Sequence, residues 1–376
     1  MRQRAYRKIT MQRLRPVILF LLAWVMPNVP GFAHAAGHME HLSAAAPSGY
    51  SGDLLIFPEV STYFRFDQEP THKLADSEII PALNVFYTSD YKQLRFLGEW
   101  LLSTKTHNVE RLQLGLHLGE SSLWLGRFHN PIGYWNMQFH HAAILQTTII
   151  RPGIMAFETA GGIIPNHLTG FLFEGVHEFE KAGLYYTVGA GAGPDLNKGL
   201  QAFNIFEPGG SHRPGVSFRL GYQPISYGAD EIGISGAYTE LPGDRVSYNQ
   251  VKQVVASTYA NWHINDFRFL SEAVYVHNWL DRFQGGQASN GFANVYGQLE
   301  WDYRTAWTLY GRIEGTFGGH NDAYLALFPL YVKDRFLGGV RYKLNHNMAL
   351  KLEASQDHLR EDRFGQVMFQ WSALFP

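Results

Sequence analysis

The sequence predicts an all-β protein, a transmembrane antiparallel β-barrel of about 16 strands, and three observations support this prediction. Polar and apolar residues alternate along most of the chain, as in residues 111–120, where Leu112, Leu114, Leu116 and Leu118 alternate with polar residues and glycine. An export signal precedes this pattern. No other segment approaches the roughly 20 consecutive apolar residues that a membrane helix needs. A chain that spans a membrane without helices must close into a barrel, because backbone groups cannot stay unpaired in lipid.

The amino-terminal 36 residues have the features of a secretory signal peptide. Six Arg and Lys residues and no acidic residue precede an apolar run at 17–25, and small residues follow at 33–36. A retained signal anchor is the alternative, but Pro16, Pro27 and Pro30 would break its helix. We predict a signal peptide at 1–36, a mobile periplasmic lead-in at 37–52 and the barrel at 53–376.

The composition excludes several classes of protein. Removal of residues 1–35 takes away six of the 31 Lys and Arg residues and none of the 33 Asp and Glu residues, which leaves a formal charge of −8. Such a chain is not expected to bind nucleic acid. The absence of cysteine fits passage through an oxidising periplasm and excludes disulfides and cysteine-based zinc sites. We expect no cofactor.

Sixteen segments have the composition and periodicity of strands. They lie at about 53–65, 80–89, 92–103, 108–119, 121–128, 169–179, 182–191, 214–223, 231–239, 251–262, 265–277, 291–303, 305–317, 332–343, 347–358 and 363–375.

The connections between these segments alternate in length, as the periplasmic turns and outer loops of a bacterial barrel do. Counts of fourteen or eighteen remain open, because Leu123 and Leu125 share a face with Arg127 and because residues 231–239 are weakly patterned. A soluble β-sandwich is the alternative fold, but sandwiches rarely sustain so many outward apolar residues. The amphipathic last segment, with Phe375 near its end, resembles the signal by which assembly machinery recognises outer-membrane barrels.

One face of the predicted barrel carries charges of both signs, which belong in an aqueous lumen because charge facing lipid is costly. The lumen charges that we expect are Arg95, Glu99, Arg111, Arg268, Glu272, Arg312 and Glu314. They could form opposing rows across a constriction or simple pairs that keep the wall soluble. Neither arrangement has a single sign, so strong ion selectivity does not follow.

Residues 129–168 form a long connection that is not low in complexity. It contains Trp135, Phe139, Ile154 and other large apolar residues, which need a place to pack. Loops of this length are usually functional or disordered. We predict that the segment folds into the barrel and narrows it.

The root of this segment resembles a known family. Residues 124–133, Trp-Leu-Gly-Arg-Phe-His-Asn-Pro-Ile-Gly, are similar to a turn of phosphate-selective-type porins and their uncharacterised porin-like relatives. Tyr134-Trp135-Asn136, His140-His141, Arg151-Pro152 and 161–165 extend the resemblance over roughly residues 120–175. It implies a homotrimeric diffusion channel whose third outer loop turns inward.

The function expected from the sequence is an outer-membrane porin that passes small hydrophilic solutes or ions and contacts outer-membrane lipid. We expect Arg127, Arg151 and Glu158 at the constriction. Pro131 and Gly133 should form the turn that directs the chain inward.

Other functions are also considered. His38 and His41 are three residues apart with Glu40 between them, and His129, His140, His141 and His167 lie in or beside the long connection, so zinc or copper could bind. We expect instead that the loop imidazoles hydrogen-bond the loop backbone or line the pore, and we predict no metal site. A barrel hydrolase would pair His177 or His277 with a serine such as Ser271, but no nucleophile motif is present, and we do not expect an enzyme. A nonconducting adhesin or scaffold is the remaining alternative.

Overall fold

The computed structural model describes residues 49–376 except 70–73, 141, 197–198, 207–210 and 244–247. The predicted signal peptide and residues 37–48 of the predicted lead-in therefore lie outside the described residues. Within the described part of the chain, no helix is long and apolar enough to cross a membrane.

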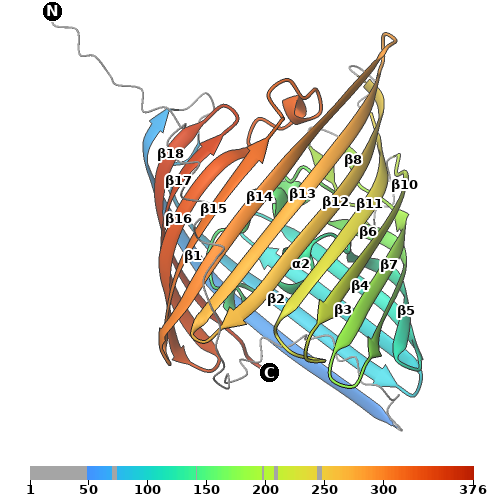
Figure 1. Ribbon diagram of the computed structural model, residues 1–376, viewed down its shortest axis with the longest axis vertical. Coiled ribbons are helices and arrows are strands. Elements are labelled where there is room, and N and C mark those ends of the chain that lie inside the picture. The colour runs from blue at the N-terminus through green and yellow to red at the C-terminus, as the bar shows by residue number, and fades with distance from the viewer. Residues whose placement is uncertain (1–48, 70–73, 141, 197–198, 207–210, 244–247) are drawn as a thin grey trace, which may run out of the picture. The chain divides into compact units, whose positions relative to one another are not determined.

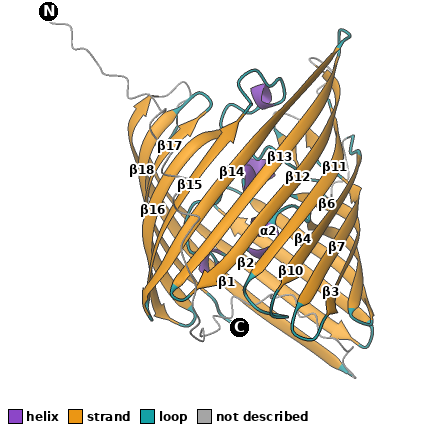
Figure 2. Cartoon of the chain, in the orientation of Figure 1, coloured by secondary structure: helices purple, strands orange, loops and turns teal. Residues whose placement is uncertain are grey.

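Sixteen antiparallel strands form one closed barrel (Figure 1). They are β1 (Tyr50–Glu69), β2 (Ser77–Tyr91), β3 (Leu94–Ser103), β4 (His107–Leu118), β5 (Ser121–His129), β6 (His167–Glu178), β7 (Gly183–Ala192), β10 (Pro214–Gln223), β11 (Glu231–Pro242), β12 (Tyr248–Ile264), β13 (Phe267–Arg282), β14 (Gln287–Arg304), β15 (Trp307–Phe317), β16 (Val332–Asn345), β17 (Met348–Leu359) and β18 (Arg363–Ala373). β8 (Asp195–Leu196) and β9 (Leu200–Gln201) pair with each other in the connection between β7 and β10. The predicted count of sixteen is confirmed, and the helices among the described residues are short pieces of the connections (Figure 2).

The barrel closes by pairing of β1 with β18. Their register runs from Glu59 opposite Ser372 to Phe66 opposite Gly365. Beyond the end of β18, Phe375 and Ile56 exchange backbone hydrogen bonds of 2.8 and 2.9 Å. The carboxyl-terminal residues therefore complete the seam of the barrel.

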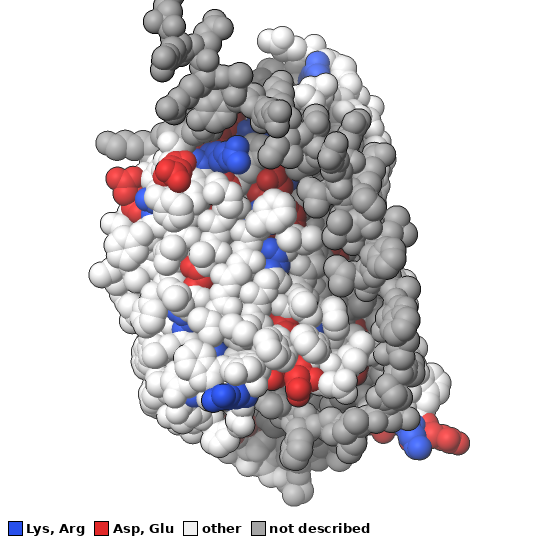
Figure 3. Space-filling view, turned by 60° about the vertical axis from the view of Figure 1, so that its left-hand side comes forward, with Lys and Arg blue, Asp and Glu red and all other residues white. Residues whose placement is uncertain are grey.

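Alternation places polar and apolar side chains on opposite faces of the barrel. On β4, Leu114 is 64% exposed and Leu116 is also exposed, whereas Gln113 and His117 are buried. In the space-filling view of one side of the molecule, most of the described surface is uncharged (Figure 3). The exposed face is therefore apolar and the buried face polar, the reverse of a protein folded in water.

Tight turns alternate with longer connections over much of the barrel, but the connections predicted to be longer near 240–250 and 278–290 are short, with five residues between β11 and β12 and four between β13 and β14. Lys92, Gly119 and Asn265 occupy turns of two residues and have positive φ angles of 55°, 69° and 53°. Such conformations match the twist of the flanking strands in tight hairpins. The longest connection among the described elements runs from 130 to 166.

Several strands are longer than predicted, as in β1, which begins at Tyr50 rather than at residue 53, and the difference is largest at one hairpin. β13 and β14 extend toward each other beyond the predicted ends at 277 and 291, and pairing continues to Asp281 opposite Gln287. Gly285 and Gly286, with φ angles of 90° and 88°, make the turn. Residues 278–290 are mostly polar residues or glycine, so pairing between the strands, rather than local β-propensity, sustains these strand ends.

Candidate functional site

Residues 130–166, which we call the inserted segment, connect β5 to β6. The segment contains α2 (Tyr134–Gln138) and three short 3₁₀ turns, η2 (Ala143–Leu145), η3 (Gly153–Met155) and η4 (Glu158–Ala160). Its apolar side chains share one buried cluster with wall residues such as Val255 and Leu270. Trp135, only 1% exposed, lies edge-on to Tyr296 of β14 at 6.3 Å between ring centroids. The segment therefore packs on the buried face of the barrel.

Carboxylates of distant strands hold the backbone of the inserted segment. Glu353 of β17 accepts hydrogen bonds from the N–H groups of Ile149 and Ile150 at 2.8 and 3.0 Å. Glu314 of β15 accepts one from Gly153 at 2.7 Å, and Glu300 of β14 accepts one from the Thr147 hydroxyl at 2.8 Å. These bonds satisfy backbone and side-chain groups that would otherwise be buried without partners.

Cationic side chains of the same wall bind carbonyl groups of the segment. Lys351 Nζ donates to the carbonyl oxygens of Ala143 at 2.6 Å and Thr148 at 3.3 Å. Arg341 donates to the carbonyl oxygen of Ile144 at 2.6 Å. Residues 143–153 are thus held by both acidic and basic side chains of the wall. The carboxylates accept hydrogen bonds from N–H or hydroxyl groups, and the cations donate to carbonyl oxygens.

The root of the inserted segment contains Pro131 and Gly133, the residues predicted to form the turn. Both are buried, and Gly133 has a φ angle of 71° at the start of α2. Its N–H donates to the Ser235 hydroxyl at 2.8 Å, and a Cβ atom at this position would lie 1.8 Å from Glu272 Oε1. Only glycine fits both the backbone conformation and this close approach.

The three charges expected at the constriction are each engaged by other groups of the protein. Arg127, 2% exposed, donates to the carbonyl oxygens of Glu110 at 3.1 Å and Phe203 at 3.0 Å. Arg151 donates to the His140 carbonyl oxygen at 2.7 Å, and its guanidinium carbon lies 3.4 Å from the centroid of the Phe157 ring. Burial lowers the pKa of Arg151 to about 9, so the group remains charged at neutral pH.

Glu158, the third of these charges, binds the backbone where the inserted segment enters β6. Its Oε1 accepts the N–H groups of Asn166 and His167 at 2.8 and 3.1 Å, and its Oε2 lies 2.8 Å from His167 Nδ1. The carboxylate is thus used in holding the root of the segment.

The irregularity at Arg127 has a backbone cause. Gly126 has a φ angle of 138°, a conformation that other residues rarely adopt. It lies between Leu125, which is 53% exposed, and Arg127, which is buried. The glycine therefore interrupts the alternation of exposed and buried residues. This interruption made the strand difficult to predict.

The predicted lumen charges lie on the buried face and pair mainly across neighbouring strands. Arg111 lies 2.6 Å from Glu99, and Arg268 lies 3.4 Å from Glu300, each pair opposite in register. Arg95 instead pairs with Asp90 at 2.9 Å. The arrangement is that of paired charges along the wall.

Of the other predicted lumen charges, Arg312 and Glu314 belong to one connected group of ion pairs, and Glu272 is held separately by hydroxyl groups. Arg312 lies 3.9 Å from Glu314, which also pairs with Arg335 at 2.7 Å, while Arg335 further binds Asp357. Glu272 accepts hydrogen bonds from Ser257 and Tyr296 at 2.8 and 2.9 Å. Glu300 and Arg335 were missed in the prediction, although period-two alternation from Gln298 and Leu337 would have placed them on this face.

Three histidines meet at the root of the inserted segment. His129 ends β5, His167 begins β6 directly opposite it, and His140 follows α2. Their ring centroids are separated by 4.1 Å (His129 to His140), 4.7 Å (His140 to His167) and 5.3 Å (His129 to His167). His141 lies outside the described residues.

The histidines considered for a hydrolase, His177 and His277, have other neighbours than Ser271. His277 Nε2 lies 3.0 Å from the hydroxyl of Ser289 rather than that of Ser271, and its Nδ1 lies 3.3 Å from the Tyr275 hydroxyl. His177 packs edge-on against Phe179. Among the described residues, the His277 ring contacts Ser289, Tyr275 and Trp279, and none of these is a carboxylate that would orient the ring as in a catalytic triad.

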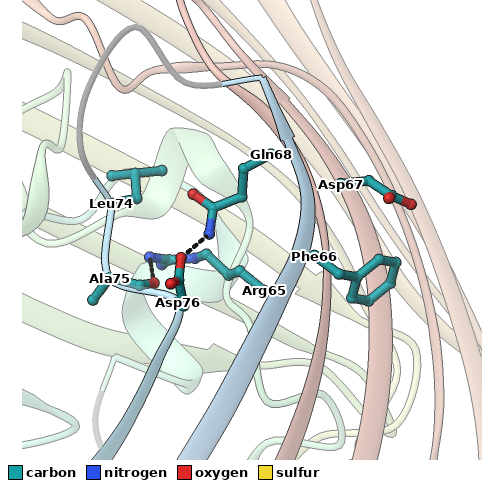
Figure 4. A pocket seen from close by; sticks show the side chains of 7 residues that line it. All are labelled: Arg65, Phe66, Asp67, Gln68, Leu74, Ala75 and Asp76. Atoms are coloured by element: carbon teal, nitrogen blue, oxygen red, sulfur yellow. Dashed lines mark hydrogen bonds between the residues drawn. The ribbon is translucent and has the colours of Figure 1, made fainter.

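A hollow at the connection of β1 and β2 is lined by residues 65–68 and 74–76 (Figure 4). Arg65 donates to the Ala75 carbonyl oxygen at 3.0 Å, and Gln68 donates to Asp76 at 2.7 Å. These hydrogen bonds cross the hollow and join the two ends of the connection between β1 and β2.

The fold is shared with solved outer-membrane channels. The outer membrane channel DcaP of Acinetobacter baumannii is 10% identical and matches over 88% of this chain and 99% of its own, with a TM-score of 0.57. OmpT of Vibrio cholerae in its trimer form is 11% identical over 87% of this chain and 100% of its own, with a TM-score of 0.55. The anion-selective porin from Comamonas acidovorans is 11% identical with the same coverage and a TM-score of 0.54.

These similarities define the fold class as the sixteen-stranded barrel found in outer-membrane porins. No protein-family model and no curated protein matches the sequence.

Proposed function

We propose that the protein is an outer-membrane porin, a passive diffusion channel for small hydrophilic solutes or ions. The observation that carries the proposal is a closed barrel with an apolar exposed face and a charged buried face. An apolar exterior suits contact with outer-membrane lipid, and charges on the other face suit an aqueous lumen. A barrel of sixteen strands is wide enough to hold water.

The inserted segment is proposed to narrow this lumen. Its contacts with Glu300, Glu314 and Glu353 suit a loop that crosses from β5 to the wall formed by β14–β17. Pro131 and Gly133 would direct the chain inward, and the charges of Arg127, Arg151 and Glu158 would lie along the narrowed region. A constriction fixed by many charged hydrogen bonds would be static, so the space beside the segment would limit conductance.

The proposed solutes are hydrophilic molecules or ions of either charge rather than phosphate alone. The resemblance to phosphate-selective-type porins predicts a cluster of cations free to bind an anion. Arg312, Arg335, Arg341 and Lys351 do gather on β15–β17, but each lies against a carboxylate or a carbonyl oxygen. Cations already engaged in this way favour weak ion preference.

Export, assembly and oligomeric state complete the proposal. The predicted signal peptide would direct the chain to the periplasm, and the strand that ends near Phe375 would be recognised by the barrel-assembly machinery. The trimer form of OmpT makes a homotrimer the proposed assembly. Native mass spectrometry of the detergent-solubilised protein should then give a mass of three chains, and a single-chain mass would refute the trimer.

Single-channel recording in a planar bilayer tests the channel. The wild type should give discrete open steps, with a reversal potential in a salt gradient that reports ion preference. Deletion of residues 137–160 should raise the conductance while circular dichroism still reports a β-barrel. A folded deletion variant with unchanged conductance would refute the role of the segment as a constriction.

Burial of the wall charges favours a second candidate, a nonconducting barrel that acts as an adhesin or scaffold. Glu272, Arg312, Lys351 and Glu353 are each at most 2% exposed, so water has little access to the wall where the inserted segment covers it. If the segment fills the lumen, the wild type will be silent and the deletion variant will conduct.

A further inference from the structure

We infer that His129, His140 and His167 form a binding site for a divalent transition-metal ion of the Zn²⁺ or Cu²⁺ class. One ring nitrogen of each histidine lies within 4.8 Å of those of the others. The three side chains are 5%, 2% and 3% exposed. Imidazole nitrogen is a preferred ligand of these ions. The inference concerns the root of the inserted segment and does not depend on channel activity.

The backbone fixes two of the three ligands before any ion binds. His129 and His167 are directly opposite in the ladder between β5 and β6. The next backbone bond, from the Asn130 N–H to the Asn166 carbonyl oxygen at 2.8 Å, holds the strand ends together. A site built on paired strands loses little conformational freedom when a ligand binds.

The third ligand is positioned by α2. The Phe139 N–H donates to the Trp135 carbonyl oxygen at 2.8 Å, which ends the helix next to His140. The His140 ring stacks on that of His129, with an angle of 29° between the ring planes. The inserted segment thus brings a third imidazole to the two on the wall.

Hydrogen bonds on the Nδ1 atoms suit metal binding through Nε2. His140 Nδ1 is bonded to Asn136 Oδ1, and His167 Nδ1 is bonded to Glu158 Oε2. An oxygen acceptor at Nδ1 favours the tautomer with the proton on Nδ1, in which Nε2 carries the lone pair that can bind a metal ion. Metal-binding histidines almost always have such a partner on the other ring nitrogen.

A carboxylate is placed to act as the fourth ligand. Glu110 Oε2 lies 3.1 Å from His167 Nε2. Two ligands about 2.0–2.1 Å from a tetrahedral zinc ion are separated by about 3.3 Å, close to this distance. The carboxylates of Glu99, Glu110 and Glu158 also offset the charge of a divalent ion beside Arg127, which lies 3.9 Å from Glu110.

The competing explanation is a purely structural cluster in which a protonated His167 bridges Glu110 and Glu158. Metal titration distinguishes the two. The full chain, folded in detergent micelles and treated with a chelator, is titrated with Zn²⁺ by calorimetry and with Co²⁺ by its visible absorption spectrum. His38→Ala and His41→Ala are introduced throughout, so that the amino-terminal pair contributes no binding.

One ion per chain should bind, with a Co²⁺ spectrum typical of tetrahedral coordination. His140→Gln should weaken binding at least tenfold, and Glu158→Gln should weaken it about 10–100-fold through loss of the Nδ1 partner. His117→Gln is the matched control, because His117 is also buried but lies on β4 beside Asp90. The His117→Gln variant should bind the metal ion as tightly as the parent does.

Absence of stoichiometric binding by the parent would overturn the inference. Equal binding by the His140→Gln and His117→Gln variants would also overturn it. Circular dichroism and heat-dependent gel mobility establish that each variant is folded, and His140 lies outside the strands, so its substitution leaves the barrel ladder intact.

Discussion

Replacement of Glu353 by alanine should release the middle of the inserted segment from the wall. Glu353 is 1% exposed and accepts two backbone hydrogen bonds, from Ile149 and Ile150. A hydrogen bond to a charged group contributes about 1.5–3 kcal/mol, so two contribute about 3–6 kcal/mol. Water that enters the space of the lost side chain recovers part of this, which leaves an expected loss of about 2–4 kcal/mol.

Limited proteolysis and chemical unfolding measure this loss. If the free energy of opening the segment falls by about 2–4 kcal/mol, protease cleavage within residues 143–153 should be faster by about 30-fold or more. The reason is that the cleavage rate follows the population of the open form. Guanidinium unfolding followed by tryptophan fluorescence reports whether the same free energy is lost from the whole barrel. Glu353→Gln keeps the volume and one carbonyl oxygen, so it should lose about half as much.

A matched control removes a different buried carboxylate. Glu231 bonds Arg219, Gln223 and Tyr259 on β10 and β12, so Glu231→Gln should weaken the wall without freeing residues 143–153. Equal proteolysis of Glu353→Ala and the wild type would refute the reasoning, because it would mean that the two bonds do not hold the segment.

Three further predictions concern single side chains. Gly133→Ala should lower the unfolding temperature more than Gly119→Ala. Both glycines have φ near 70°, but only at position 133 would a Cβ atom lie against a neighbour. An equal fall in unfolding temperature in the two variants would mean that backbone strain alone destabilises them and would contradict the steric argument. Arg335→Met should cost about 3–5 kcal/mol in chemical unfolding by removing the cation that Glu314 and Asp357 share, and Asp357→Asn in the same variant should recover part of the loss. Burial raises the pKa of Tyr134 to about 12, so its neutral form stabilises the folded state; this contribution is complete below pH 10 and is lost as the pH rises toward 12, and Tyr134→Phe should remove it, whereas identical pH profiles would contradict the assignment.

Most strands could be predicted because they carry a local signal in the alternation of polar and apolar residues. The spacing of Leu114, Leu116 and Leu118 by itself indicates an apolar face. All sixteen predicted segments form strands. The positions of Glu353 and Ile149 relative to each other could not be predicted in this way. Their contact joins residues 204 positions apart, and nothing local in either stretch specifies it.

The histidine cluster illustrates the same limit. His129 and His140 are near in sequence, and strands 121–128 and 169–179 were predicted to follow one another. The meeting with His167 depends on register, because a shift of one residue would turn it to the other face. Gly126 adds a break in alternation that periodicity cannot reveal. Sequence patterns thus identified the residues of the root but not their arrangement.

The way in which the inserted segment is held separates the two proposed functions. Bonds from Glu300, Glu314, Glu353 and Lys351 to the segment are charge-assisted and buried, so the segment should not swing aside spontaneously. A conducting wild type would therefore mean that a permanent path runs beside the segment, and Glu353→Ala would change its conductance modestly. A silent wild type that conducts after Glu353→Ala would mean that the segment is a plug. The same substitution therefore tests how the segment is anchored and which of the two functions that anchoring serves.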